Sequence, residues 1–178
     1  MLTCHYYKAL RIIVLVLIIL LLCACTNQTN DNSNNITQDN TLYSAILNII
    51  QADIVPGDNL PLSISYSNAV YSSISFTILS QSDDHGRANV DFTYVDVLAL
   101  VDGYTGTLED VDSFYEYCID AILSKRVTRL KEISAVSYSV IIENNEKRYV
   151  IDDIENLPNI LTGGMFSVLE NALNEVEQ

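Results

Sequence analysis

The chain has 178 residues, with 9 Lys and Arg against 23 Asp and Glu, four Cys, no Trp and a net charge of −14. That length suits one domain of about 100–150 residues with additional segments. Because an acidic surface repels phosphate groups, the charge excludes nucleic-acid binding through a basic footprint. The composition also excludes the collagen-like, coiled-coil and disulfide-scaffold classes.

The start of the chain has the pattern of a secretory signal. Lys8 and Arg11 precede an unbroken apolar run of eleven residues, 12–22. A signal-peptide core needs about 7–15 apolar residues, whereas a bilayer-spanning helix needs about 20. We therefore predict that residues 1–24 are a signal peptide, with a short uncleaved anchor helix as the alternative. Without this segment the chain keeps 7 basic and 23 acidic residues, a net charge of −16.

The apolar run ends in Leu22-Cys23-Ala24-Cys25, and the sequence becomes polar directly afterwards. This tetrapeptide resembles the lipobox of bacterial lipoproteins, which has an aliphatic residue at −3, a small residue at −1 and Cys at +1. Cys23 departs from the residues usual at −2. The resemblance implies cleavage between Ala24 and Cys25 and attachment of diacylglycerol to the Cys25 sulfur. Two or more acyl chains, such as palmitate, anchor a protein stably. We therefore expect a lipid-anchored protein at the cell membrane, facing outside the cytoplasm.

Residues 25–40 are predicted to form a disordered tether. Residues 26–40 are rich in Asn and Thr, and only Ile36 among them is large and apolar. Such a segment buries too little surface to offset the entropy lost on ordering it. A flexible coil of this length separates its ends by roughly 20 Å, which suits a spacer between a membrane and a folded domain. The domain itself is assigned to residues 41–178.

A helix and a loop are predicted at the start of the domain. Apolar residues recur at helical spacing directly after Asn40 and Thr41, either of which can cap the helix. These apolar positions are Leu42, Ala45, Ile46, Ile49 and Ile50. Pro56-Gly57 ends the helix, and residues 56–68, which include two prolines, are expected to form a loop.

A β-hairpin is predicted next. Alternation with period two indicates one strand over residues 70–78 and a second over residues 88–94. The apolar positions are Val70, Ile74, Phe76 and Ile78 in the first strand and Ala88, Val90, Phe92 and Tyr94 in the second. Residues 81–87, which are polar, are expected to form the turn between them.

A long amphipathic helix is predicted after the hairpin. Its apolar stripe begins at Leu108, continues to Leu123 and is extended by Val127 and Leu130. The other stripe positions are Val111, Tyr115, Cys118 and Ile122. Acidic residues crowd its start and basic residues its end, an order that complements the helix dipole. These residues are Glu109, Asp110 and Asp112 at the start, and Lys125, Arg126, Arg129 and Lys131 at the end.

The C-terminal part is predicted to hold a second hairpin and two helices. The elements are strands over 136–142 and 148–151, a turn over 143–147, a short helix over 157–161 and a final helix over 165–176. Two hairpins can join as one antiparallel sheet with helices covering one face, so the expected fold class is α+β.

Two segments carry a family resemblance: "AVYSSISFTILSQSDDHGRANVDFTYVDV" and "NNEKRYVIDDIENLPNILTGGMFSVLENAL". They look like Gram-positive lipoprotein domains of unknown function with the nuclear transport factor two-like (cystatin-like) superfold. In those domains a strand with Trp precedes a short helix, Thr-Gly-Gly and a last helix. Here Tyr149 stands at the Trp position, and Thr162-Gly163-Gly164 matches. The resemblance implies a curved antiparallel sheet of four or more strands, wrapped on a long helix like a cone.

The sequence offers no assembled catalytic or metal-binding set. Without the signal, the chain has one His, His85, and its polar turn favours solvation over catalysis. One His and two Cys are too few for a zinc site, and the loop at 102–106 lacks the alternating oxygen ligands of a calcium loop. With Cys25 acylated, Cys118 has no disulfide partner and is expected to pack in the core. We therefore expect no catalytic residues, no metal and no cofactor.

Asp96 is the sharpest candidate for chemistry. If the second strand keeps its alternation, Asp96 shares a face with Phe92 and Tyr94, and the three residues would line a pocket. An acid facing an apolar cavity has a raised pKa, as in isomerases and dehydratases on the resembled fold. Val95 and Val97 switch the apolar phase, however, which indicates a bulge or strand end that points Asp96 to water.

Three functional hypotheses follow. The leading one is a lipid-anchored lipoprotein whose non-catalytic domain binds an unidentified protein, peptide or small ligand at the cell surface. The alternative is an isomerase- or hydratase-type enzyme that uses Asp96 in a cone-shaped pocket. A third is a structural or assembly partner that uses an exposed face of the sheet. The many Tyr residues suit an interface or a pocket lining, and equally suit packing.

Overall fold

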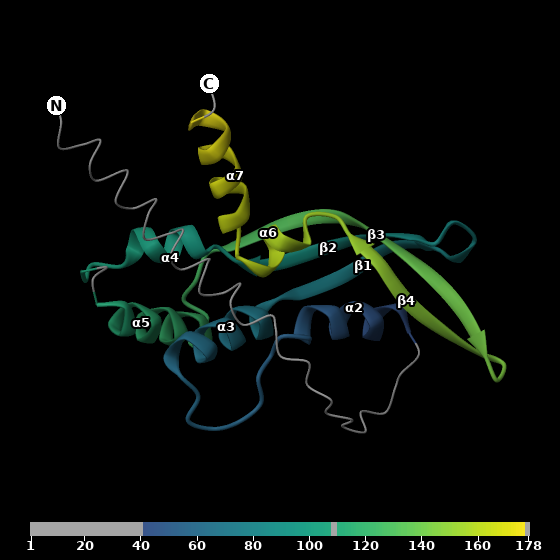
Figure 1. The fold of residues 1–178 in the computed structure, drawn as a ribbon, viewed down its shortest axis with the longest axis horizontal. Helices are drawn as coiled ribbons and strands as arrows, with labels where there is room; N and C mark the ends of the chain where they lie inside the picture. The colour runs from purple at the N-terminus through teal and green to yellow at the C-terminus, as the bar shows by residue number, and fades with distance from the viewer. Residues whose placement is uncertain (1–40, 108–109, 177–178) are drawn as a thin grey trace.

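The computed structural model describes residues 41–107 and 110–176 (Figure 1). The predicted signal peptide (1–24), tether (25–40) and lipidation site at Cys25 lie outside these ranges, as do Leu108 and Glu109. Within them the fold is α+β, with six α-helices and one open antiparallel sheet of four strands. No helix in the described ranges has the length and apolar character needed to cross a bilayer.

The strands lie side by side in the order in which they occur along the chain, β1-β2-β3-β4. Their bounds are β1 Ser75–Ser82, β2 Arg87–Val95, β3 Arg129–Glu143 and β4 Glu146–Ile154. The helices are α2 Leu42–Gln51, α3 Leu62–Ser73, α4 Val97–Gly103, α5 Val111–Leu123, α6 Leu157–Leu161 and α7 Met165–Val176, and a 3-10 turn, η1, covers Asp83–His85. The two predicted hairpins therefore form one sheet, as expected.

The side chains of β2, one of the two inner strands, point alternately to the two faces of the sheet, and these faces differ in burial. Its inner face, which packs against helices, carries the buried residues Ala88, Val90, Phe92 and Tyr94. Its outer face carries Arg87, Asn89, Asp91 and Thr93, none of which is buried. Because side chains alternate along a strand, the register with the other strands extends both faces across the sheet.

The inner face packs against α2 and α6. Ile46 and Ile50 of α2 and Ile160 of α6 are buried in one cluster with the inner side chains of β2 and β3. Thr41 caps α2 by accepting a hydrogen bond from the Ser44 amide, as its position predicted. The helix against the sheet is therefore α2, whereas the resemblance placed the long helix there.

The long helix α5 belongs to a second core at the end of the sheet. Cys118 of α5 is buried there with residues of α3 and α4 and with Val95 at the end of β2. The helices α3 and α5 pack against each other, to one side of the strands in Figure 1. Cys118 is a core residue, as its position on the apolar stripe predicted.

The loop expected over residues 56–68 is wrong, because α3 begins within it. Pro61 occupies the N-cap position, where a missing amide donor costs nothing. Tyr66, Ala69 and Val70 are buried at helical spacing. The strand predicted from residue 70 therefore begins only at Ser75, and its first apolar positions belong to the helix and its C-cap.

The structure also corrects the region around the long helix. Residues after β2 form α4, which the sequence did not predict. The extension of α5 through Leu130 is wrong. The chain turns at Lys125, which has a φ of 57°, and the Arg126 amide donates to the Ala121 carbonyl in the manner of a Schellman ending. Arg129 and Lys131 therefore belong to β3, which is longer than predicted, as is β4.

Thr162-Gly163-Gly164 forms the corner between α6 and α7. The Thr162 hydroxyl donates to the Pro158 carbonyl at 2.7 Å and accepts from the Phe166 amide at 3.1 Å. Both glycines have positive φ, and a Cβ on Gly163 would come within 2.3 Å of a Val97 methyl. The tripeptide that carries the family resemblance therefore has a structural role here. Thr162 holds the corner through its hydrogen bonds, and only glycine fits the close approach at position 163.

Ser134 provides a direct test of this packing. Its Oγ on the inner face of β3 is buried and has no hydrogen-bond partner among the described residues. A buried unpaired hydroxyl costs about 1–3 kcal/mol. We expect Ser134→Ala to raise the free energy of unfolding by about 1 kcal/mol in denaturant titrations. Ser137→Ala, on the outer face of the same strand, should change it by less than about 0.5 kcal/mol. Destabilisation by Ser134→Ala would contradict this packing.

Candidate binding surface

Asp96 lies at the junction of β2 and α4. The strand ends at Val95, and the Asp96 carboxylate accepts a hydrogen bond from the Ala99 amide at 3.0 Å as the N-cap of α4. Its own amide donates to the Thr128 carbonyl. The interpretation in which the strand continues through Asp96 is therefore wrong, and the predicted strand end is confirmed. Asp96 is half-buried at this end, whereas the alternative pointed it to water. Phe92 and Tyr94 are core residues of the inner face.

The Tyr94 hydroxyl joins a polar network that the sequence did not indicate. It donates to the Glu132 carboxylate at 2.7 Å and accepts from the Asn159 side chain at 3.2 Å. Asn156 donates to the second Glu132 oxygen, and Ser167 donates to Asn159 Oδ1. Burial, followed by the hydrogen bond and charge of Glu132, raises the pKa of Tyr94. The network ties α6 and α7 to the inner face, and its members occur far apart in sequence.

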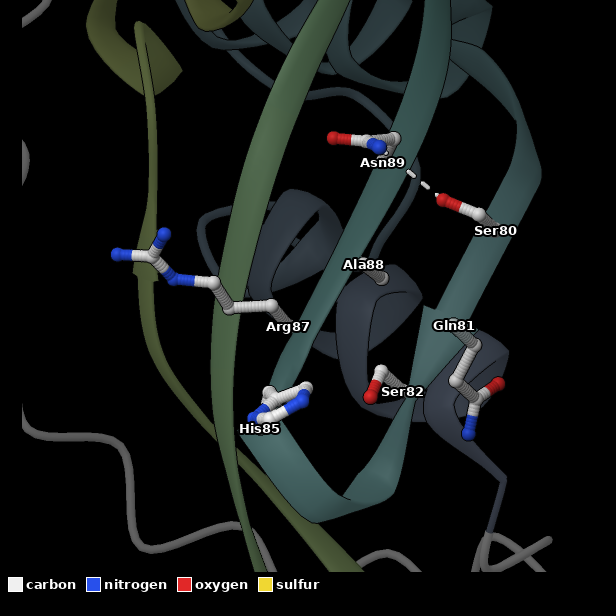
Figure 2. A pocket seen from close by; sticks show the side chains of 7 residues that line it. All are labelled: Ser80, Gln81, Ser82, His85, Arg87, Ala88 and Asn89. Atoms are coloured by element: carbon white, nitrogen blue, oxygen red, sulfur yellow. Dashed lines mark hydrogen bonds between the residues drawn. The ribbon is translucent and has the colours of Figure 1, made fainter.

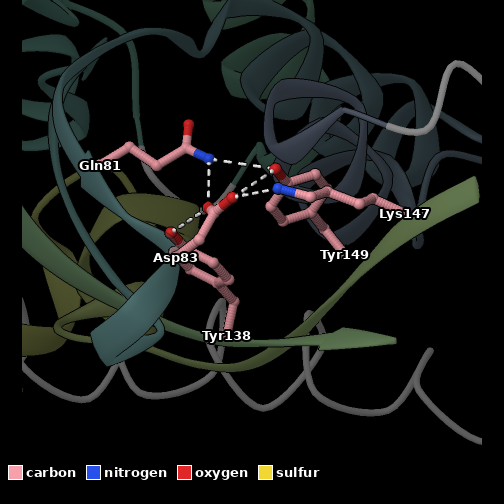
Figure 3. Close-up of polar contacts among 5 residues, drawn as sticks. All are labelled: Gln81, Asp83, Tyr138, Lys147 and Tyr149. Carbon is pink, nitrogen blue, oxygen red and sulfur yellow. Dashed lines mark hydrogen bonds and ion pairs between the residues drawn. The ribbon is translucent and has the colours of Figure 1, made fainter. Parts of the chain in front are cut away.

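A second polar cluster surrounds Asp83 in the turn after β1 (Figure 3). Asp83 Oδ1 accepts from Gln81 at 2.8 Å and from the Tyr138 hydroxyl at 3.1 Å. Its Oδ2 accepts from Lys147 at 3.0 Å and from the Tyr149 hydroxyl at 3.3 Å. One carboxylate therefore links the end of β1 to β3 and β4.

These contacts favour the ionised form of Asp83. The hydrogen bonds from Gln81 and then Lys147 lower the pKa of its carboxyl to about 2. Burial, followed by the hydrogen bond to Asp83, raises the pKa of Tyr138 to about 12. Beside the cluster, Gly86 has a φ of 58°, and a Cβ there would lie 2.3 Å from the Tyr138 carbonyl oxygen. The turn is thus fixed by charge and by close backbone contact.

A polar hollow of about 630 Å³ lies on the β1–β2 hairpin (Figure 2). Its lining residues are Ser80, Gln81, Ser82, His85, Arg87, Ala88 and Asn89. Asn89 donates to the Ser80 hydroxyl at 3.0 Å. The Arg87 side chain has no hydrogen bond or ion pair within residues 41–107 and 110–176, so its donors are available to a ligand. Hydroxyl, amide, imidazole and guanidinium groups together suit polar recognition.

Four lining residues of the hollow, Ser80, Ser82, Arg87 and Asn89, belong to a larger exposed surface, the outer face of the sheet. Ile133 on β3 is 66% exposed, and Ile141 on the same strand is 41% exposed. Polar side chains surround them, including Thr77 of β1 and Arg148 of β4. The outer face therefore combines single exposed aliphatic side chains with a mainly polar surface.

The described residues show no cluster of three or more potential metal ligands of the His, Cys, Asp and Glu types. His85 lies exposed in the turn and lines the hollow together with the hydroxyl groups of Ser80 and Ser82. Burial raises the pKa of the Cys118 thiol to about 12, which disfavours the reactive thiolate. The polar groups of the hollow can form hydrogen bonds and charge pairs with a ligand.

The chain was compared with protein-family models, curated proteins and solved structures, and none of the three comparisons gave a match. The resemblance to lipoprotein domains therefore stays a prediction from the sequence.

Removal of the Asp83 charge tests the cluster in Figure 3. We expect Asp83→Asn to lower the melting temperature at neutral pH, because the neutral amide loses the charged hydrogen bond with Lys147. Asp84→Asn is the matched control, since exposed Asp84 makes no hydrogen bond or ion pair with the described residues. Equal melting temperatures for the two variants would contradict this role.

The pH dependence follows from the same contacts. The folded-state pKa of Asp83 is about 2, below the ordinary 3.8. Its ionisation therefore stabilises the fold above the ordinary pKa, and this stability is lost as the pH falls toward 2. The difference between wild type and Asp83→Asn should be full at pH 6 and should shrink through that acidic range, as measured by thermal unfolding. A constant difference would contradict the pKa shift.

Proposed function

We propose that this chain is an extracytoplasmic lipoprotein, held at the cell membrane through lipid on Cys25, whose α+β domain binds a protein, peptide or small ligand. The observation that carries the binding part is the outer face of the sheet with its polar hollow, a face that the described residues leave exposed. Helices pack on the other face and at one end of the sheet, and the guanidinium donors of Arg87 have no partner among the described residues. The anchoring part rests on the sequence around Cys25.

The proposal includes the finer fold interpretation, a curved sheet of the nuclear transport factor two-like type. Its support is the set of hydrogen bonds around Asp83. Gln81 at the end of β1 donates to the Tyr149 hydroxyl on β4, although two strands separate them in the sheet. Such a contact across the inner face requires the sheet to curve.

The anchor is tested by two cysteine variants. We expect Cys25→Ala to move the protein out of the lipid-modified membrane fraction, because the acylated sulfur is lost. Cys23→Ala should remain lipidated, since it is the matched change two residues earlier. Mass spectrometry of the mature protein should find diacylglycerol on an N-terminal Cys25. An intact Met1 with no added lipid would contradict the anchor.

The binding surface is tested by photo-crosslinking in cells. A photoreactive amino acid placed at Asn89, in the hollow, should crosslink a discrete partner or ligand. The control position is Glu116, which is exposed on α5 away from the sheet. Excess Arg87→Ala protein should fail to compete for the crosslink, whereas excess wild-type protein should compete. Equal crosslinking at both positions, or none at Asn89, would contradict a binding role for the hollow.

A further inference from the structure

The two edge strands of the sheet differ sharply in charge. The edge strand β4, with sequence EKRYVIDDI, carries five charged side chains among its nine residues. The edge strand β1, with sequence SFTILSQS, carries none and has no proline. Proteins commonly protect exposed edges against pairing with other chains by placing charges or proline there. Such protection is present on β4 and absent from β1.

The free side of β1 is exposed as well as uncharged. Among the described residues, β1 pairs only with β2. Leu79 forms a bulge and is 52% exposed, while Ser75 and Thr77 are exposed before it. The bulge interrupts the ladder and leaves the stretch up to Ile78 as a short regular edge. A short extended peptide fits such an edge better than a long strand does.

Aromatic residues border this edge on the inner side. Phe76 of β1 stacks on Tyr43 of α2 with ring centroids 4.5 Å apart, and Tyr43 is 48% exposed. An added strand places every second side chain on the same side as Phe76. Those side chains would pack on the exposed Tyr43 ring, which gives the edge a preference for alternating apolar residues.

Charge selects the kind of peptide. Asp91 lies directly opposite Thr77 on the outer face, and exposed Asp84 follows the end of β1. The chain as a whole has a net charge of −14, which opposes self-association and attracts cations. An extended peptide with basic residues on its outer side therefore complements this edge better than a second copy of the chain.

We propose that the free edge of β1 binds an extended, basic peptide by strand addition. Backbone hydrogen bonds to residues 75–78 extend the sheet by one strand, as in other cases of β-strand addition. Lysine or arginine side chains face the Asp91 side, and apolar side chains face Phe76 and Tyr43. This inference concerns a different surface from the hollow and does not depend on the lipid anchor.

The test uses the full chain purified in detergent and three synthetic peptides. The first is a capped decapeptide in which lysine alternates with valine. The second replaces lysine with glutamate, and the third is N-methylated at alternate residues so that its backbone cannot pair. We expect only the first to bind. Hydrogen-exchange mass spectrometry should show slower exchange over residues 75–82 and unchanged exchange over residues 146–154.

Two matched variants locate the site. Leu79→Lys places a cation on the β1 edge and should weaken binding of the first peptide at least about tenfold. Ile142→Lys makes the same kind of change at a 71% exposed position of the β3–β4 hairpin and should leave the affinity within about twofold. Thr77→Lys, at another exposed position of β1, should repeat the effect of Leu79→Lys, so the test survives poor folding of one variant.

Several outcomes would overturn the inference. Binding of the N-methylated peptide equal to that of the first would show that backbone pairing is not involved. Slower hydrogen exchange over β4 would show that the peptide binds the opposite edge of the sheet. A wild-type dimer that Leu79→Lys dissociates would show that the occupant is a second copy. Absence of binding by the lysine peptide at millimolar concentration would also overturn it.

Discussion

The fold depends on the alternation of side chains along β2. Val90 and Phe92 are fully buried on one face of this central strand, while Asn89 is exposed on the other. Burying each such apolar side chain contributes about 1.5–3 kcal/mol, so a one-residue slip in register is strongly disfavoured. The helices α2 and α6 pack on this inner face, and the helices α3 to α5 pack at the end of the sheet. Among the described residues the outer face stays open, which exposes the hollow, and the sheet ends at β1, which leaves the edge of that strand free.

The elements that could be predicted from the sequence are those determined locally. The alternation from Ala88 to Tyr94 gave β2, and the spacing from Leu42 to Ile50 gave α2. The elements that were missed depend on neighbours distant in sequence. The sequence around Val70 alternates like a strand but forms the helix α3, because α3 packs against α5 and Val70 is buried in their shared core. The apolar pattern predicted for the long helix extends to Leu130, beyond the end of α5. Leu130 is apolar because it lies in β3 and packs against the core on the inner face of the sheet.

The candidate site was predictable only in part. Asp96 was the acidic residue that the sequence most favoured for catalysis. In the structure its carboxylate accepts a hydrogen bond from an amide in the first turn of α4, which is the ordinary role of an N-cap. Glu132 and Asn159, which meet at the Tyr94 hydroxyl, come from β3 and α6 and share no local pattern. Sequence spacing reports which residues share a face of one element. It does not report which elements bring polar groups together, and for this reason the hollow beside Arg87 became visible only in the structure.

The openness of the outer face is tested most directly by thiol labelling of the intact protein. A Cys introduced by Ile133→Cys lies at the centre of this face, and native Cys118, which is fully buried with a pKa of about 12, serves as the internal reference. Peptide mass spectrometry after maleimide treatment at pH 7 separates the two sites. We expect labelling at position 133 to be on the order of a hundredfold faster than at Cys118. Equally slow labelling of both thiols would show that the outer face is covered, and would contradict one-sided packing of the sheet.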